Sequence, residues 1–228
     1  MAFTIAIETA TKVCSVALFH NEELVAFKEE GGEYSHAEKL AVFVDSLLKE
    51  QKVQYDQLAA IAVSKGPGSY TGLRIGVSFA KGLSYSLQIP LIAVDTLQAM
   101  AWGAQKELGK EEVLLCPMID ARRMEVYTAL FNNKLEIVKE ISADIIEENS
   151  YASYLKQKEI CFFGDGAVKC KTILQHPNAN FLEEQFVSAK NMGGILFGKY
   201  LENNFEDLAY FEPYYLKEFI ALKGKRLV

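Results

Sequence analysis

A glycine-rich segment is the first place in this sequence where the backbone could meet a ligand. Residues 64–76 read SKGPGSYTGLRIG and join an apolar run, Leu58 to Val63, to a helical pattern. Loops at such junctions commonly hold ligands in α/β proteins. Gly66, Gly68 and Gly72 spell GxGxxxG, however, and no Lys-Ser or Lys-Thr pair follows, so the spacing fits neither standard phosphate-binding motif. The segment permits phosphate binding without indicating it.

Other catalytic chemistries need side chains that the chain supplies sparingly. A zinc peptidase needs HExxH or several convergent ligands, and the histidines are His20, His36 and His176. Ser69 and Thr71 are of nucleophile type, but no histidine stands nearby in sequence to activate them. We therefore predict no catalytic and no metal-binding residue.

The stretch around Arg122 is a second candidate for ligand contact. Arg122 could orient an anion, and Tyr127 could donate a hydrogen bond to one. Asp120 and Glu125 stand on either side of Arg122 and Arg123, and such surface charges commonly form ion pairs of little energetic weight. We interpret the stretch as a tight turn with local salt links.

The composition is that of an ordinary soluble globular protein. Its 228 residues are 50% hydrophobic, enough for one large or two small domains. The net charge is -6 and the only basic block is Lys223 to Arg226, so any RNA should be met through a more basic partner. The first residues enter a strand pattern without a secretory leader, and no run of about 18 apolar residues occurs. We expect a cytoplasmic protein without a membrane partner. Reduced core thiols are expected at Cys14, Cys116, Cys161 and Cys170.

An internal repeat predicts the architecture. Residues 7–21 are echoed by residues 119–133 at a constant offset of 112, and the echo includes an acid, a turn Asn and the triplet Ala-Leu-Phe. A repeat of this size indicates a duplicated supersecondary unit. Each copy continues into a third strand pattern, Leu24 to Lys28 or Leu135 to Lys139, and then into a helix and a further strand. Both halves therefore read βββαβα.

Two linked βββαβα units are the plan of the α/β fold shared by actin, sugar kinases and Hsp70 (ASKHA), which holds nucleotide between its halves. We predict an N-terminal subdomain over residues 1–105, a C-terminal subdomain over 106–210, and a tail over 211–228 that could pack back on the first subdomain. The helix of the second half is expected to start near Ser142.

The predicted fold places an acid at the end of the first strand of each half, where it helps to hold metal and phosphate. Glu8 and Asp120 occupy those places but lack the usual following glycines. Gly164 and Gly166 follow a strand pattern, as glycines on the nucleoside side would, although GDG is also a common turn. The predicted cofactor-binding residues of this vestigial cleft are Glu8, Gly66, Gly68, Asp120, Gly164 and Gly166.

The helix after the glycine loop carries small side chains in rows at a spacing of four. Glycine inside a helix costs about 1 kcal/mol relative to alanine, so the rows indicate that something packs unusually close. The neighbour is either the protein's own sheet or another helix. The first row is Gly72, Gly76, Ala80 and Ser84, and the second is Ser78, Gly82 and Ser86.

A preceding amphipathic helix, Ser35 to Lys49, could pair with this small-residue helix. Its start is marked by a Ser35 and Glu38 capping box. We predict that the two helices form a four-helix interface with a second protein, a contact that fits a scaffold better than a catalyst. The predicted interface residues are Leu40, Val44, Leu47, Gly72, Gly76 and Ala80.

Four ordered motifs make the chain resemble the bacterial TsaB family, the dimerisation subunit of the tRNA threonylcarbamoyladenosine machinery. The resemblance covers nearly the whole chain. The glycine loop alone is also similar to that of TsaD, the catalytic paralogue. The motifs are the opening run Ile5 to Leu18, the loop Gly66 to Gly76, the run Ile119 to Tyr127, and Glu212 to Lys217.

The resemblance implies an accessory protein. TsaD carries paired metal-binding histidines, whereas the corresponding places here, Ser35 to Leu40 and Val94 to Ala101, hold only His36. The family likeness implies a heterodimer with TsaD, a role for the ATPase TsaE, self-association of the isolated chain, indirect contact with tRNA, and ATP as a possible ligand of the complex rather than of this chain.

Two enzymatic alternatives stay open from the residues. A degenerate ATPase or kinase-like enzyme would use Glu8, Asp120 and the glycine loop. A glycoprotease-type peptidase would need a metal site for which the three histidines offer little.

Overall fold

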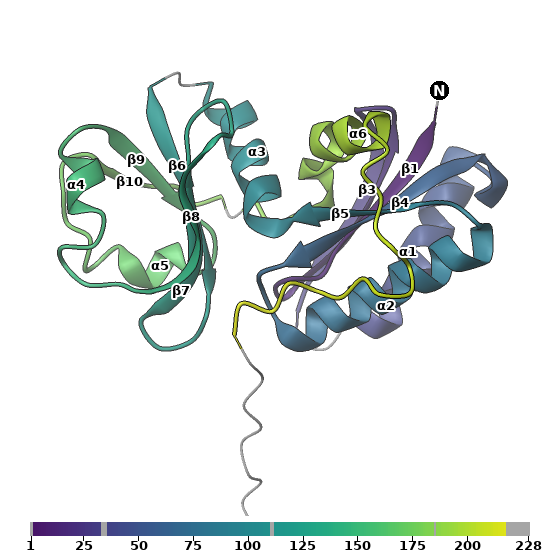
Figure 1. Cartoon of the computed structure of the whole chain (residues 1–228), viewed down its shortest axis with the longest axis horizontal. Coiled ribbons are helices and arrows are strands. Elements are labelled where there is room, and N and C mark those ends of the chain that lie inside the picture. The colour runs from purple at the N-terminus through teal and green to yellow at the C-terminus, as the bar shows by residue number, and fades with distance from the viewer. Residues whose placement is uncertain (1, 33–35, 110–111, 185, 218–228) are drawn as a thin grey trace, which may run out of the picture.

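Each half of the molecule is built on a five-stranded mixed sheet, as Figure 1 shows. The computed structural model describes residues 2–32, 36–109, 112–184 and 186–217. The first sheet has the order β3-β2-β1-β4-β5, and the second has the matching order β8-β7-β6-β9-β10. Equal strand orders confirm the duplication, with a fifth strand added to each predicted unit.

The strands of each half pair in the same way. The first three are antiparallel neighbours, and the fourth and fifth run parallel to the first. The strands are β1 (Phe3–Glu8), β2 (Val13–His20), β3 (Glu23–Gly31), β4 (Leu58–Gly66), β5 (Leu91–Asp95), β6 (Val113–Asp120), β7 (Glu125–Phe131), β8 (Ile137–Ile145), β9 (Glu159–Phe163) and β10 (Ala179–Phe181).

The two halves differ in their helices. The first has α1 (His36–Gln51) and α2 (Tyr70–Leu87), whereas the second has only the four-residue helices α4 (Ala152–Leu155) and α5 (Ala167–Cys170). None of the described helices has the length and apolar composition needed to cross a bilayer. The other helices are η1 (Tyr55–Gln57), α3 (Thr96–Leu108), η2 (Ala189–Asn191) and α6 (Gly193–Leu201).

The prediction that a helix starts near Ser142 is wrong. Ser142 lies in β8, where it pairs with Thr128, and the strand continues to Ile145 opposite Glu125. Strand pairing with β7 outweighs the weak helical periodicity of this stretch. Ser35, the predicted cap of α1, lies outside the described residues, and the helix itself begins at His36.

Helices cover both faces of the first sheet. The α1 and α2 side packs through Leu40, Val44 and Leu47 onto β1 and β2. The opposite side is covered by α6 and η2, whose Ala189 and Leu196 pack against β-strand residues. Residues 189–201 therefore cover the first sheet, although the predicted division places them in the second subdomain. Helix α3 lies between the sheets and packs on the second one as well (Figure 1).

The described part of the tail returns to the first half. The backbone N–H of Tyr214 donates to the carbonyl of Lys65 at 2.7 Å. Lys81 of α2 donates to the carbonyl of Phe211 at 3.0 Å, and the Tyr215 ring lies 4.6 Å from that of Tyr70. In Figure 1 this yellow segment runs beside α2 toward the second half.

Helix α2 lies close to the turn between β1 and β2. Ser69 caps the helix by accepting the N–H of Gly72 at 3.2 Å. A Cβ added at Gly72 would lie 2.2 Å from the Thr9 carbonyl oxygen, and one at Gly76 would lie 2.1 Å from Thr9 Oγ1. The close neighbour of the first small-residue row is thus the chain's own turn.

The pair Gly76→Ala and Gly82→Ala tests this packing on one helix. We expect Gly76→Ala to lower the free energy of unfolding by roughly 1–3 kcal/mol through overpacking against buried Thr9. Gly82 is exposed with no atom within 4 Å of an added Cβ, so Gly82→Ala should raise it by up to about 1 kcal/mol. Urea denaturation measures both, and equal effects would contradict the assignment.

Candidate functional site

The glycine loop is closed by the chain's own carbonyl groups. Gly66 has φ +113°, and a Cβ there would lie 2.7 Å from the Tyr214 carbonyl oxygen. A Cβ at Gly68 would lie 2.4 Å from the Ala10 carbonyl oxygen, which accepts the N–H of Ser69 at 2.7 Å. Carbonyl oxygens in these positions would repel a phosphate. The loop does not fit the phosphate of a nucleotide.

Glu8 is buried beneath this loop, at 1% exposure. Its Oε1 accepts the N–H of Ala10 at 2.6 Å and the hydroxyl of Ser64 at 2.8 Å. Burial raises the pKa of Glu8 to about 7, although these hydrogen bonds favour the carboxylate. Glu8 therefore ties β1 to β4 from inside the core.

Other atoms of the chain also occupy the space beside the glycines of the second half. Gly164 has φ +100°, and a Cβ there would lie 2.3 Å from the Met118 carbonyl oxygen. The same oxygen accepts the N–H of Gly166 at 3.0 Å. The run GDG thus turns tightly against β6, and Asp165 in it accepts the N–H of Asp120 at 2.9 Å.

The carboxylate of Asp120 forms an ion pair with Lys169. Lys169 Nζ donates to its Oδ1 at 2.5 Å. Partial burial acts to raise the pKa of Asp120, but the Lys169 hydrogen bond and the Arg122 N–H outweigh it and the pKa is lowered. Among the described residues, no hydrogen bond or ion pair joins the predicted cleft residues of the first half to those of the second. Nucleotide binding between the two halves stays a prediction.

The salt links predicted for Arg122 and Arg123 are made by other residues. Lys169 pairs with Asp120, and Lys217 from the tail pairs with Glu125. Both arginine side chains are exposed. The turn is tight, as predicted, but its acids form their ion pairs with lysines, and Arg122 adds only its nearby charge to Asp120.

His36 and Ser69 have structural partners. His36 Nε2 donates to the Thr11 carbonyl at 2.8 Å, which ties α1 to the β1–β2 turn. Within the described ranges, no group of three His, Cys, Asp or Glu side chains could hold a metal ion. The predicted reduced core thiols are confirmed, since all four cysteines are buried and free.

The predicted interface residues lie inside the chain. Leu40, Val44 and Leu47 are each 1% exposed and Ala80 is 0% exposed, and Gly72 and Gly76 contact Thr9. They are covered in the isolated chain, where the small residues accommodate the chain's own β1–β2 turn, and their contact with a partner stays a prediction. Within the chain, α2 contacts the protein's own sheet at the β1–β2 turn and also lies beside α1. The predicted interface residues in question are Leu40, Val44, Leu47, Gly72, Gly76 and Ala80.

A groove lies between α1 and α2, and Leu40 is the predicted interface residue that lines it. It has a volume of about 340 Å³ and an apolar floor with small and polar side chains around it. Gly82, one turn beyond, faces open space. In the sequence, this surface was indicated by the second row of small residues, to which Ser78 and Gly82 belong. The outer face consists of Ala37, Leu40, Thr71, Arg74, Ile75, Ser78, Phe79 and Gly82.

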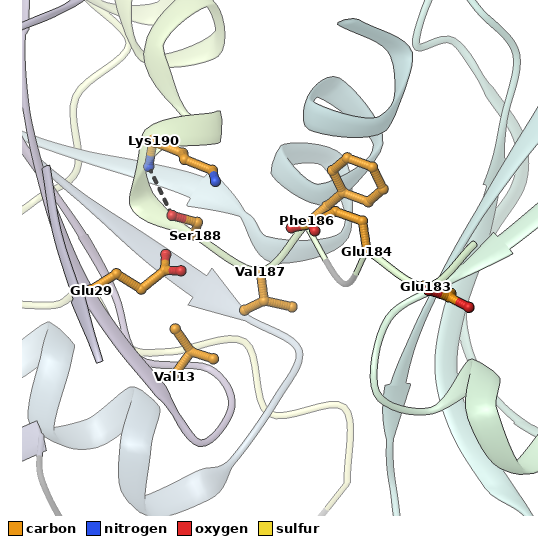
Figure 2. Close-up of a pocket in the computed structure, with 8 residues that line it drawn as sticks. All are labelled: Val13, Glu29, Glu183, Glu184, Phe186, Val187, Ser188 and Lys190. Atoms are coloured by element: carbon orange, nitrogen blue, oxygen red, sulfur yellow. Dashed lines mark hydrogen bonds between the residues drawn. The ribbon is translucent and has the colours of Figure 1, made fainter. Parts of the chain in front are cut away.

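A smaller pocket of about 220 Å³ lies beside the segment that leads from β10 to η2 (Figure 2). No sequence motif indicated it. Glu29 faces the pocket from β3, and Ser188 accepts the N–H of Lys190 at 3.4 Å on its wall. Its lining is Val13, Glu29, Glu183, Glu184, Phe186, Val187, Ser188 and Lys190.

Comparison with known proteins decides the family. The family model described as TsaD, tRNA N6-adenosine threonylcarbamoyltransferase, matches residues 30–210. The tRNA threonylcarbamoyladenosine biosynthesis protein TsaB of Buchnera aphidicola subsp. Schizaphis graminum is 31% identical over 171 residues, which are 73% of this chain and 80% of that protein. The chain belongs to the TsaB family. The resemblance read from its four motifs is thereby confirmed.

Other TsaB family members align over shorter stretches. The TsaB proteins of Bacillus subtilis and Escherichia coli are 36% and 40% identical over 61% and 55% of this chain. The chain spans 59% and 53% of their lengths. A crystal structure described as an uncharacterized protein with similarity to peptidase YEAZ from Pseudomonas aeruginosa is 27% identical, with a TM-score of 0.83 over 95% of this chain and all of that one. A second structure, YeaZ from the same organism, has a TM-score of 0.81.

Replacing Glu8 with glutamine tests its buried state. Its pKa of about 7 exceeds its ordinary value of 4.5, so the folded protein holds a proton that the unfolded chain loses between these pH values. Stability from this group is therefore present at low pH and lost as pH rises toward 7. We expect Glu8→Gln to be more stable than wild type at pH 8, by on the order of 2 kcal/mol, and to gain little at pH 4.5.

Denaturation curves across this pH range measure the difference. Glu148→Gln, at an exposed position, is the matched control and should follow wild type. Parallel pH profiles of Glu8→Gln and wild type would contradict the assignment.

Proposed function

We propose that this chain is a non-catalytic accessory and dimerisation subunit of the complex that forms threonylcarbamoyladenosine beside the anticodon of tRNA. It pairs with TsaD, works with the ATPase TsaE, and reaches tRNA as part of the complex. The same face mediates self-association when the chain is alone. Membership of the TsaB family supports the pathway, and the outer face of α1 and α2 is the observation that carries the pairing.

The outer face suits close helix packing. Ile75 and Phe79 are half-buried on it. Gly82 lies in the middle of α2 with no atom near the place of a side chain. A glycine there costs about 1 kcal/mol of helix stability without any packing gain inside the chain. Close approach by the helix of another protein would explain why glycine occurs at this position.

The closed glycine loop supports an accessory role. An ATPase or kinase-like enzyme of this fold would bring phosphate to the loop of Gly66 and Gly68. The carbonyl oxygens of Tyr214 and Ala10 stand against those two glycines. ATP is accordingly assigned to the assembled complex and not to this chain.

The variant Ser78→Arg tests the proposed face. Ser78 is exposed in the groove, so a long cation there would be desolvated on pairing without a counter-ion. We expect at least about tenfold weaker binding to TsaD, since uncompensated charges at helix contacts are strongly unfavourable. Calorimetric titration of purified TsaD measures the loss, and sedimentation measures the parallel loss of self-association.

Ser153→Arg is the matched control, because Ser153 is an exposed helical serine in α4 of the other half. It should bind TsaD as wild type does. Wild-type binding by a folded Ser78→Arg protein would overturn the interface. Modification of purified tRNA by TsaD, TsaE and the threonylcarbamoyl donor should require the chain. Equal modification in its absence would overturn the proposed function.

A further inference from the structure

The turn between β6 and β7 holds two neighbouring arginines in an unfavourable backbone conformation. Arg122 has φ +71° and Arg123 has φ +53°. Residues other than glycine, asparagine and aspartate adopt this left-handed region at a cost of roughly 1 kcal/mol or more each. The turn is closed by Ala121 N–H to Glu125 O at 3.1 Å and Glu125 N–H to Arg122 O at 3.2 Å. If only the stability of the fold mattered, glycine or asparagine would be favoured at these two positions.

The corresponding turn of the first half, between β1 and β2, is covered by other parts of the chain, and its residues do not have the positive φ of Arg122 and Arg123. By the offset of 112, Ala10 and Thr11 correspond to Arg122 and Arg123. Ala10 packs against Gly68 of the loop that leads into the 18-residue helix α2. The second half has the four-residue α5 in that place. Its turn is therefore open to solvent, and both arginines are exposed.

The acids beside the arginines are already neutralised. Lys169 Nζ donates to Asp120 Oδ1 at 2.5 Å, and also to the carbonyls of Arg123 at 2.6 Å and Glu125 at 2.8 Å. Lys217 pairs with the Glu125 carboxylate. Among the residues that the structure describes, no hydrogen bond or ion pair engages either guanidinium group. The lysines thus brace the turn, and neither arginine forms an ion pair among the described residues, although the charge of Arg122 acts on nearby Asp120. The net charge of the protein is -6.

We propose that Arg122 and Arg123 contact the phosphodiester backbone of the tRNA. This inference rests on the proposed function and assigns this chain a direct contact with the RNA, which the sequence assigned to a more basic partner. Guanidinium groups suit phosphate because they donate paired hydrogen bonds and stay charged. Phosphate contacts of this kind position a nucleic acid without reading its sequence.

The location of the turn agrees with such a contact. The tail connects it to the start of α2, since Tyr215 packs on Tyr70 and Lys217 reaches Glu125. Arg74, on the outer face proposed to meet TsaD, lies one turn along α2 from Tyr70. An RNA held by the heterodimer could therefore touch this chain at its second half while bound to TsaD.

The double variant Arg122→Asn with Arg123→Gly tests the proposal without endangering the fold. Asparagine and glycine adopt positive φ at lower cost than arginine, so the variant should unfold at the same or higher urea concentration. Its complex with TsaD should bind tRNA on the order of tenfold more weakly near 0.1 M salt, and the slope of log affinity against log salt should fall by about 1 to 2. The KM for tRNA should rise with kcat unchanged.

The control is Lys156→Gln with Lys158→Gln, which removes the same charge from exposed positions after α4. It should bind and modify tRNA like wild type. A wild-type salt slope and KM for the arginine variant would overturn this proposal while leaving the accessory role intact. A complex that modifies tRNA equally well without this chain would overturn the proposed function itself.

Discussion

The close contact between the β1–β2 turn and the start of α2 is the constraint on which the first half depends. Thr9 and Ala10 lie against Gly68, Gly72 and Gly76 so closely that no larger side chain fits at those three positions. This contact sets the angle at which α2 leaves β4, and it encloses Glu8 beneath the loop. It also sets the Ala10 carbonyl oxygen against Gly68. The outer side of α2, with Ser78 and Gly82, is turned to solvent as a consequence.

The two halves share one sheet plan and differ in the helices that cover it. The two sheets have the same strand order and pairing, so the backbone places an equivalent turn at the end of β1 and of β6. In the first half an 18-residue helix covers that turn, and in the second a four-residue helix does not. Lys169 takes over as a brace through three hydrogen bonds. The connection between the first two strands is thus part of the core in one half and an exposed basic surface in the other.

Some features of the candidate site were predictable because they depend on neighbours in sequence. The acid, turn and Ala-Leu-Phe echo at offset 112 predicted the paired sheets, and the row spacing of α2 predicted an unusually close neighbour. Helical periodicity identifies which residues share a row but not which row faces the sheet. Gly76 and Gly82 therefore looked equivalent, although one contacts Thr9 and the other contacts nothing. The helix expected after Ser142 failed for a related reason, since pairing with β7 is not visible in local sequence.

The sequence by itself determined the duplicated fold, the family and the scarcity of catalytic side chains, because these follow from periodicity, repetition and residue type. Only the tertiary structure decided what each charged or small residue touches. Asp120 and Glu125 stand next to arginines in the chain, yet lysines 49 and 92 residues away neutralise them. Likewise Gly66 meets the carbonyl of Tyr214 from the tail. Such contacts join segments that are distant in sequence, and only the packing of the folded chain brings them together.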